Sequence, residues 1–174
     1  MKKFNVLMIM LLSSFLSFQS CSNDDDEESM TVDRQTFVTQ AASGNMLEIQ
    51  AGAMAAQSAQ NTDVKAYGQH MVQDHSQASA ELASIANSKQ LSVPATLTEK
   101  HQAQLNALKP LTGAAFDKAF MTLMVTSHQE QVSLFEQASI GVNDDDLRAL
   151  AANKLPILRE HLQGAQQLNA TVNP

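Results

Sequence analysis

Apolar and small residues recur every three or four positions along most of the chain from Thr31 onward, which places them on one face of an α-helix. Four long stretches show this period, and three of them begin at residues that cap helix starts, Asp33, Asn61 and Asp144. The pattern predicts four long helices. They run from about Asp33 to Ala59, from Asn61 to about Lys89, from about Ala114 to Ser139, and from after Gly141 to about Leu168.

The connection between the second and third helices is much longer than the other two. Residues 91–113 contain Pro94 and Pro110 on either side of a short helical stretch from about Thr98 to Leu108. The short connections make each flanking pair of helices antiparallel, and the long one can cross the whole bundle. We therefore predict an all-α, ferritin-like four-helix bundle with a short helix in its crossover. An up-down bundle with a folded-back linker is the alternative.

Composition supports a helical protein and excludes several partners. Only 5% of the 174 residues are aromatic and Trp is absent, while Ala and Gln recur with few β-branched runs. The net charge of −7 argues against nucleic acid as a partner. A single cysteine, Cys21, excludes an intrachain disulfide and a cysteine-rich zinc module. Any chemistry must come from histidine, carboxylate, methionine or hydroxyl groups.

Each of the four expected helices carries one polar residue at the centre of its apolar face. These residues are Glu48, His75, His128 and His161. Their neighbours on the same face are apolar or small, because the helix turns about 100° per residue. Those neighbours include Gly44 and Gly52 on the first helix, Met71 and Leu82 on the second, Met124 and Phe135 on the third, and Ile157 and Ala165 on the fourth.

The four polar residues lie near the middle of their helices, so a bundle can bring them to one level. A buried carboxylate without a partner is costly and recruits a histidine or a metal ion. Three imidazoles and one carboxylate suit one transition metal, Zn, Fe or Cu. The sequence thus predicts metal ligands at Glu48, His75, His128 and His161. The alternative is a metal-free hydrogen-bond network that fixes helix register.

Residues near these four positions have two interpretations each. Asp74 and Glu160 each precede a core histidine, so each orients an imidazole of a neighbouring helix or faces water, and for Glu160 we expect water. Met71 and Met124 each precede a core histidine by four positions; thioethers there suit copper, although filling of the core is the commoner role. His101, in the crossover, is expected to pack and not to ligate.

The first twenty residues have the anatomy of a signal peptide. Lys2 and Lys3 precede an apolar stretch from Val6 to Phe18 that is too short to span a bilayer. The stretch ends in FQSC, which resembles the lipobox of bacterial lipoproteins, where the peptide is cut before the cysteine and the cysteine is acylated. We expect a lipoprotein signal peptide over residues 1–20 and a membrane anchor on Cys21. Ordinary secretion with a spare thiol is the alternative.

An acidic tether over residues 21–32 is expected to separate the anchor from a bundle domain over residues 33–170. Its charges resemble the signal that exports some Bacteroides-type lipoproteins to the cell surface, and a simple spacer is the other interpretation. Loss of residues 1–20 removes Lys2 and Lys3, so the net charge falls from −7 to −9. The expected location is the outer membrane, on its periplasmic face or at the cell surface.

A series of residues follows one order along the chain: Gly44 and Glu48, the segment MVQDH ending at His75, His101, the segment FD at Phe116 before His128, and the segment LP at Leu155 before His161. This order, over about Phe37 to Leu168, resembles the bacterial family described as domain of unknown function 4142. The resemblance implies an exported, ferritin-like bundle, often described as an outer-membrane protein, with no established activity.

The ferritin-like comparison implies that Glu48 takes the place of a first-helix glutamate ligand and that the three histidines follow on the other helices. Di-iron members of that fold use a Glu-x-x-His pair on two helices. Here the residues three before His75 and His161 are Val72 and Leu158. A mononuclear, histidine-rich site is therefore the better expectation.

Two functions remain open from the sequence. The first is a lipid-anchored envelope protein that binds a transition metal in its bundle core. The second is a non-catalytic envelope or surface protein that binds a protein partner, with the core Glu and His residues serving as a structural network. Enzyme activity is less favoured, because the chain lacks G-x-S-x-G, H-E-x-x-H and glycine-rich phosphate-binding motifs.

Overall fold

The computed structural model describes residues 32–174, which form five helices and no strand. The helices are α1 (Arg34–Ser58), α2 (Thr62–Ser88), α3 (Glu99–Leu108), α4 (Gly113–Gly141) and α5 (Asp145–Val172). All four long helices and the short crossover helix predicted from the sequence are confirmed. The last helix continues past its expected end near Leu168. The signal peptide over residues 1–20, the anchor on Cys21 and nearly all of the tether lie outside the described residues.

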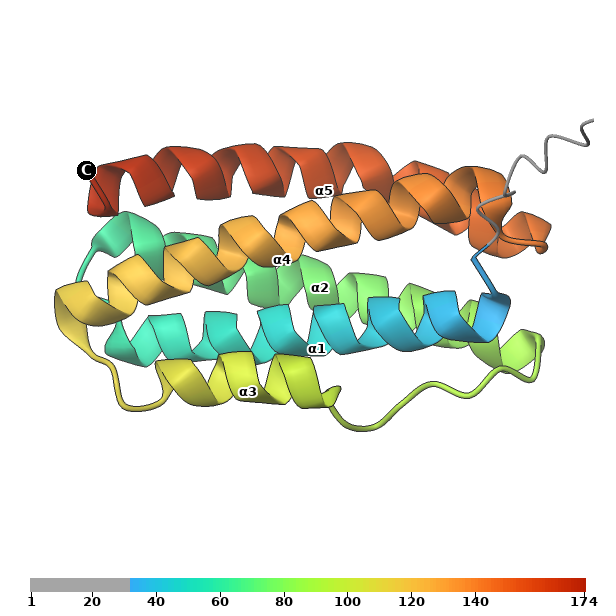
Figure 1. The fold of residues 1–174 in the computed structure, drawn as a ribbon, viewed down its shortest axis with the longest axis horizontal. Helices are drawn as coiled ribbons and strands as arrows, with labels where there is room; N and C mark the ends of the chain where they lie inside the picture. The colour runs from blue at the N-terminus through green and yellow to red at the C-terminus, as the bar shows by residue number, and fades with distance from the viewer. Residues whose placement is uncertain (1–31) are drawn as a thin grey trace, which may run out of the picture.

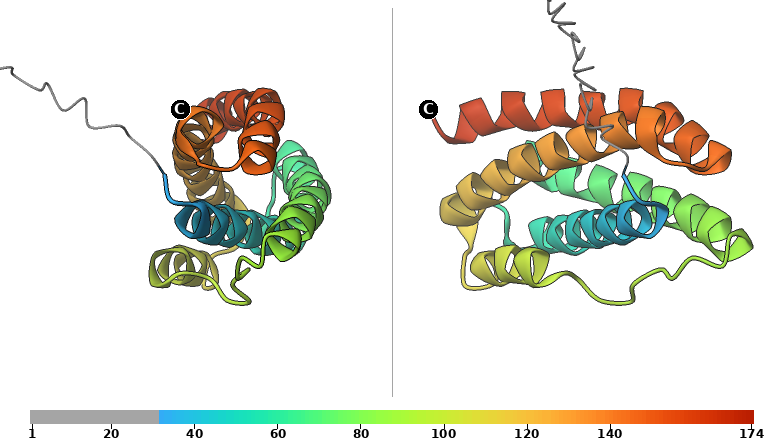
Figure 2. Two further views of the ribbon diagram at one scale, coloured as in Figure 1. Left: turned by 90° about the vertical axis from the view of Figure 1, so that its right-hand side faces the viewer. Right: turned by 45° about the vertical axis from the view of Figure 1, so that its right-hand side comes forward.

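The connection between α2 and α4 runs back along the whole bundle (Figure 1). Because of this connection, α2 and α4 point the same way. The short connections make α1 antiparallel to α2 and α4 antiparallel to α5. Viewed along the bundle, the four long helices surround a common axis, and α3 lies outside α1 (Figure 2). This is the ferritin-like arrangement, and the up-down alternative is wrong.

The helix starts are set by the capping residues that the sequence indicates. Asp33 accepts a hydrogen bond from the backbone N–H of Thr36, and Asn61 accepts one from that of Asp63. Asp144 does the same for the backbone N–H of Leu147. Each bond satisfies a donor that the first helical turn leaves unpaired, so these caps fix where the long helices begin.

Two glycines allow α1 and α2 to touch through their backbones. A Cβ atom placed on Gly52 would lie 2.5 Å from the carbonyl oxygen of Gly68, and one placed on Gly68 would lie 2.9 Å from the carbonyl oxygen of Gly52. Neither oxygen belongs to a flexible side chain that can move away. The absence of a side chain at both positions therefore sets the separation of α1 and α2.

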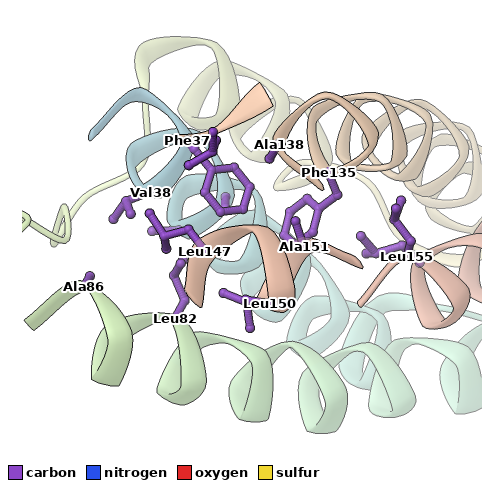
Figure 3. Packing of buried hydrophobic residues seen from close by; sticks show 14 residues of the cluster. Phe37, Val38, Leu82, Ala86, Phe135, Ala138, Leu147, Leu150, Ala151 and Leu155 are labelled. Atoms are coloured by element: carbon purple, nitrogen blue, oxygen red, sulfur yellow. The ribbon is translucent and has the colours of Figure 1, made fainter. Parts of the chain in front are cut away.

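The apolar core is divided into two clusters, one at each end of the bundle. The first contains Phe37 and Val38 from α1, Leu82 from α2, and residues from the end of α4 and the start of α5 (Figure 3). The second contains residues from the other halves of the same helices together with Leu105 and Leu108 from α3. A layer of buried polar side chains lies between the two clusters.

Among residues 32–174, no helix combines the length and the apolar character needed to cross a membrane. Each long helix also carries exposed polar residues.

Candidate metal centre

The polar layer brings together the three core histidines. His75 from α2, His128 from α4 and His161 from α5 are all buried. Their ring centroids form a nearly equilateral triangle, with separations of 5.5 Å (His75–His128), 5.4 Å (His75–His161) and 5.4 Å (His128–His161). One ligand nitrogen from each ring lies within 4.8 Å of the others. The predicted convergence of these three side chains is therefore present in the fold. We call this group the histidine triad.

Hydrogen bonds to acceptor-only oxygens fix the tautomers of two rings. The Nδ1–H of His128 donates to the main-chain carbonyl of Met124 at 2.8 Å, and a carbonyl oxygen cannot donate. The Nε2–H of His161 donates to the carboxylate of Asp74 at 3.0 Å. The lone pair of each neutral ring then lies on its other nitrogen, Nε2 in His128 and Nδ1 in His161. Asp74 on α2 thus orients the imidazole of His161 on α5, which is one of the two roles that the sequence allowed for it.

The third ring is oriented by two oxygens of α1. The Nδ1 atom of His75 lies 3.0 Å from Oδ1 of Asn45 and 3.0 Å from Oε2 of Glu48. The hydrogen-bond geometry favours Asn45 as the acceptor. With Nδ1 as the donor, the lone pair of His75 lies on Nε2.

The three nitrogens that carry these lone pairs are His75 Nε2, His128 Nε2 and His161 Nδ1. All three are buried, and within the described residues none has a hydrogen-bond partner. A buried acceptor left unpaired costs about 1–3 kcal/mol. The triad therefore gathers three such acceptors at one place while the opposite nitrogen of every ring is held by an oxygen.

Glu48 is fully buried beside the triad. Its Oε1 atom accepts a hydrogen bond from the hydroxyl of Ser127 at 2.7 Å and lies 3.7 Å from Nδ1 of His128. Its Oε2 atom faces Nδ1 of His75. The carboxylate thus approaches the outer nitrogens of two rings, and the group of mutually close ligand atoms contains the three histidines without it.

Burial favours the neutral form of His75 and His161, and the neighbours of Glu48 favour its ionised form. Burial lowers the pKa of His75 below its ordinary value. Burial, followed by the nearby rings of His75 and His128, lowers the pKa of His161 to about 4. Burial also opposes ionisation of Glu48, but His75, His128 and the hydrogen bond from Ser127 together hold the pKa of Glu48 below its usual range. Neutral imidazole is the form that binds metal ions.

A pocket of about 120 Å³ opens beside the triad. His75 and His161 line it, together with side chains of α2 and α5 that include Lys154 and Ile157. Ile157 was expected on the inner face of the last helix, and this expectation is wrong, because its side chain is 41% exposed. The pocket is where α2 and α5 leave space between them, and Ile157 borders that space.

Sequence reasoning missed Asn45 and Ser127, the two uncharged partners in the layer. Asn45 lies three positions before Glu48, so it occupies the same helical face, and a second polar residue on that stripe was the available signal. Ser127 directly precedes His128 and gave no such signal. Met71 and Met124 are buried in the second apolar cluster, and Glu160 is exposed as expected. His101 bonds to Ser43, away from the triad.

Three imidazole nitrogens around one point form a ligand set for Zn, Cu, Fe or Ni. In a tetrahedral site with metal–nitrogen bonds of about 2.0–2.1 Å, ligand atoms lie roughly 3.4 Å apart. One nitrogen from each ring of the triad lies within 4.8 Å of the others, so those atoms need to approach one another by about 1.4 Å at most.

Comparisons with known proteins agree with the fold. The family model described as "Domain of unknown function (DUF4142)" matches residues 19–168. A solved structure described as "CopM in the Cu(II)-bound form" superposes with a TM-score of 0.69 and 18% sequence identity, covering 81% of this chain and 98% of that chain. No curated protein matches this chain significantly. At this level of identity the structural likeness shows a shared fold.

Proposed function

The chain belongs to the family of domain of unknown function 4142, and we propose that its bundle binds one transition-metal ion through the histidine triad, with copper as the preferred metal. The ligands are His75 Nε2, His128 Nε2 and His161 Nδ1. The pocket between α2 and α5 leaves room for a fourth, exogenous ligand.

The observation that carries this proposal is the set of three buried ring nitrogens without a hydrogen-bond partner, on three histidines that each offer a ligand atom within 4.8 Å of the others. Three acceptor nitrogens need three donors, and a single water molecule has only two hydrogens to give. A cation satisfies all three nitrogens at once. The outer nitrogens are meanwhile held by a carboxylate, an amide and a main-chain carbonyl, which is how ligating histidines are usually oriented.

Copper is favoured over zinc and iron for two reasons. Divalent copper binds a given nitrogen site more tightly than the other first-row metals. The bundle also has the fold of a protein whose structure was solved in a Cu(II)-bound form. The single carboxylate in the layer argues against a di-iron centre, which needs several.

Glu48 is assigned a supporting role in this proposal instead of the ligand role expected from the sequence. Its oxygens approach the outer nitrogens of His75 and His128. From there the carboxylate supplies one buried negative charge close to the bound cation, while Asn45 and the main-chain carbonyl of Met124 orient the rings. That charge partly offsets the cost of placing a divalent ion in an apolar core.

The experiment measures copper bound to the purified full chain after removal of excess metal, by elemental analysis. We expect one equivalent in the parent protein and a loss of copper in His75→Ala, His128→Ala and His161→Ala. His101→Ala is the matched control, since it removes an imidazole that lies outside the triad, and it should keep one equivalent. A parent protein without bound copper, zinc or iron would leave the layer as a structural network.

We also place this metal site in the cell envelope, held at a membrane by a lipid on Cys21. The support is the sequence of residues 1–32 alone: an apolar leader, the terminal FQSC and an acidic tether. In the native host, Cys21→Ala should move the protein from the membrane fraction to the soluble fraction and abolish labelling by a radioactive fatty acid. An unchanged membrane fraction and unchanged labelling would contradict the anchor.

A further inference from the structure

We propose that His70, Asp74 and the outer nitrogen of His161 form an entry site, which captures the metal ion from solution and passes it to the histidine triad. This inference rests on the proposed function, because it describes how the same centre is loaded. It adds two residues, His70 and Asp74, that are not ligands of the triad.

The geometry of the entry site is that of a second ligand cluster. Nε2 of His70 lies 3.3 Å from Oδ2 of Asp74, and Nε2 of His161 lies 3.0 Å from the same oxygen. The ring centroids of His70 and His161 are 5.2 Å apart. The three ligand atoms lie within 4.8 Å of one another. His70 and Asp74 are separated by one turn of α2, so both project from the same side of that helix.

The three side chains form a gradient from solvent to core. The side chain of His70 is 56% exposed, that of Asp74 is 28% exposed and that of His161 is 3% exposed. An exposed imidazole can meet a hydrated ion and replace its water molecules one at a time. The fully buried triad has no such exposed ligand.

The entry site and the triad share the ring of His161. Its Nε2 atom faces Asp74, and its Nδ1 atom is one of the three unpaired nitrogens of the triad. A neutral imidazole has a single lone pair, so His161 binds an ion at one site or the other. When the ion moves from Nε2 to Nδ1 of His161, Nδ1 loses its proton and Nε2 gains one. The number of protons on the ring is therefore unchanged. Nε2–H then donates to Asp74, as the structure has it.

One pocket is lined by residues of both sites. Asp74 from the entry site and His75 from the triad line the same cavity between α2 and α5, and His161 lines it as well. An ion released by Asp74 therefore enters a space that two residues of the triad also border.

The competing explanation is that Asp74 only orients His161 and that His70 has no part in metal binding. The two explanations differ in their kinetics. An intermediate on the path lowers the barrier in both directions, so its removal slows association and dissociation by the same factor. The equilibrium constant at the triad then stays the same.

The experiment is stopped-flow mixing of Cu(II) with the metal-free full chain, comparing the parent with His70→Ala. We expect association to slow at least tenfold, dissociation into a chelator to slow by the same factor, and Kd to stay within about twofold. In the parent, the observed rate should saturate with copper concentration, as capture followed by transfer requires. The matched control is Gln69→Ala, which alters the exposed neighbour of His70 and should load at the parental rate.

Equal loading rates in the parent and His70→Ala would overturn the entry site while leaving the triad intact. Weaker equilibrium binding at an unchanged association rate would also overturn it, because His70 would then support the bound state. Failure of the proposed function has a different signature, since the parent chain would then bind no copper in either experiment.

Discussion

A main-chain carbonyl decides which nitrogen of His128 carries the proton. The acceptor is Met124, one turn earlier in the same helix, so the tautomer is fixed within α4 itself. His75 and His161 depend instead on side chains from other helices, Asn45 on α1 and Asp74 on α2. The triad therefore combines one ring set by its own helix with two rings set by the packing of neighbours.

The role of Glu48 is tested by Glu48→Gln, which keeps the shape of the side chain and removes its charge. We expect one equivalent of copper to remain bound, with affinity lowered about 10–100-fold, the usual cost of changing a group that lies directly behind metal ligands. Competition against a chelator of known affinity measures this change. Complete loss of copper would make Glu48 a direct ligand, and an unchanged affinity would remove it from the centre.

The lowered histidine pKa values predict that acid destabilises the metal-free protein. Below pH 6.5, His75 and His161 bind protons in the unfolded state but not in the folded state, because folding lowers their pKa values. The free energy of unfolding therefore falls as pH drops from 6.5 toward 4. From His161 alone, the loss between pH 7 and pH 5 is about 2 kcal/mol. The lowered pKa of Glu48 adds a further loss below pH 4.5, in the same direction.

Urea unfolding of the metal-free protein at pH 7, 6 and 5 measures this loss. His161→Asn, which cannot take up a proton, should show a shallower dependence over the same range. A stability that is the same at pH 7 and pH 5 would contradict the description of His75 and His161 as buried and neutral.

Periodicity was enough to identify the core residues Glu48, His75, His128 and His161, because the face of a residue depends only on its position along one helix. It could not identify Asn45 and Ser127 as their partners. It also could not distinguish a ligand from a supporting group at Glu48. Those distinctions depend on which atom of each side chain faces which neighbour, and that is decided between helices.

At the scale of the elements, capping residues located the helix starts well, since a cap is a local property of a few residues. The exposure of Ile157 shows where local reasoning ends. Ile157 lies one turn before His161, and this spacing predicted that it would be on the inner face of α5. It is nevertheless exposed, because it borders the pocket between α2 and α5. The sequence of α5 alone cannot predict that pocket.

The contact between α1 and α2 is tested by Gly68→Ala. The new methyl group would meet Cβ of Ala55 at 2.6 Å as well as the backbone of α1. Overpacking of this kind costs about 1–3 kcal/mol, and the better helix propensity of Ala returns up to about 1 kcal/mol. We therefore expect a net loss of about 1–2 kcal/mol in urea unfolding.

Gly164→Ala provides the matched control in α5, where the new methyl group would lie 3.4 Å from the ring of Tyr67, an ordinary contact. Helix propensity then dominates, and we expect this variant to gain up to about 1 kcal/mol. A loss of unfolding free energy in Gly68→Ala together with a gain in Gly164→Ala would support the close approach of α1 and α2. A stabilising Gly68→Ala would contradict it.

At the scale of the whole molecule, the long crossover was the feature that predicted the ferritin-like arrangement. Its length allowed α2 and α4 to be parallel, as Figure 1 shows. The division of the core into two apolar clusters with a polar layer between them was not anticipated. Each long helix contributes to both clusters, so only the assembled bundle reveals the division.

Metal binding should stabilise the whole bundle, because the triad joins α2 of one antiparallel pair to α4 and α5 of the other. A ligand present at 1,000 times its Kd adds about 4 kcal/mol to the free energy of unfolding. For a protein of this size, that corresponds to a rise in Tm on the order of 10 °C. Calorimetry with and without copper measures the rise, and His128→Ala should not show it. Equal rises in both proteins would place the copper elsewhere.

The most direct test of the central claim is anomalous X-ray diffraction at the copper absorption edge, on crystals of the full chain loaded with one equivalent of Cu(II). We expect a single strong peak inside the bundle, bonded to Nε2 of His75, Nε2 of His128 and Nδ1 of His161. A peak bound to other residues, with those three nitrogens left free, would contradict the account.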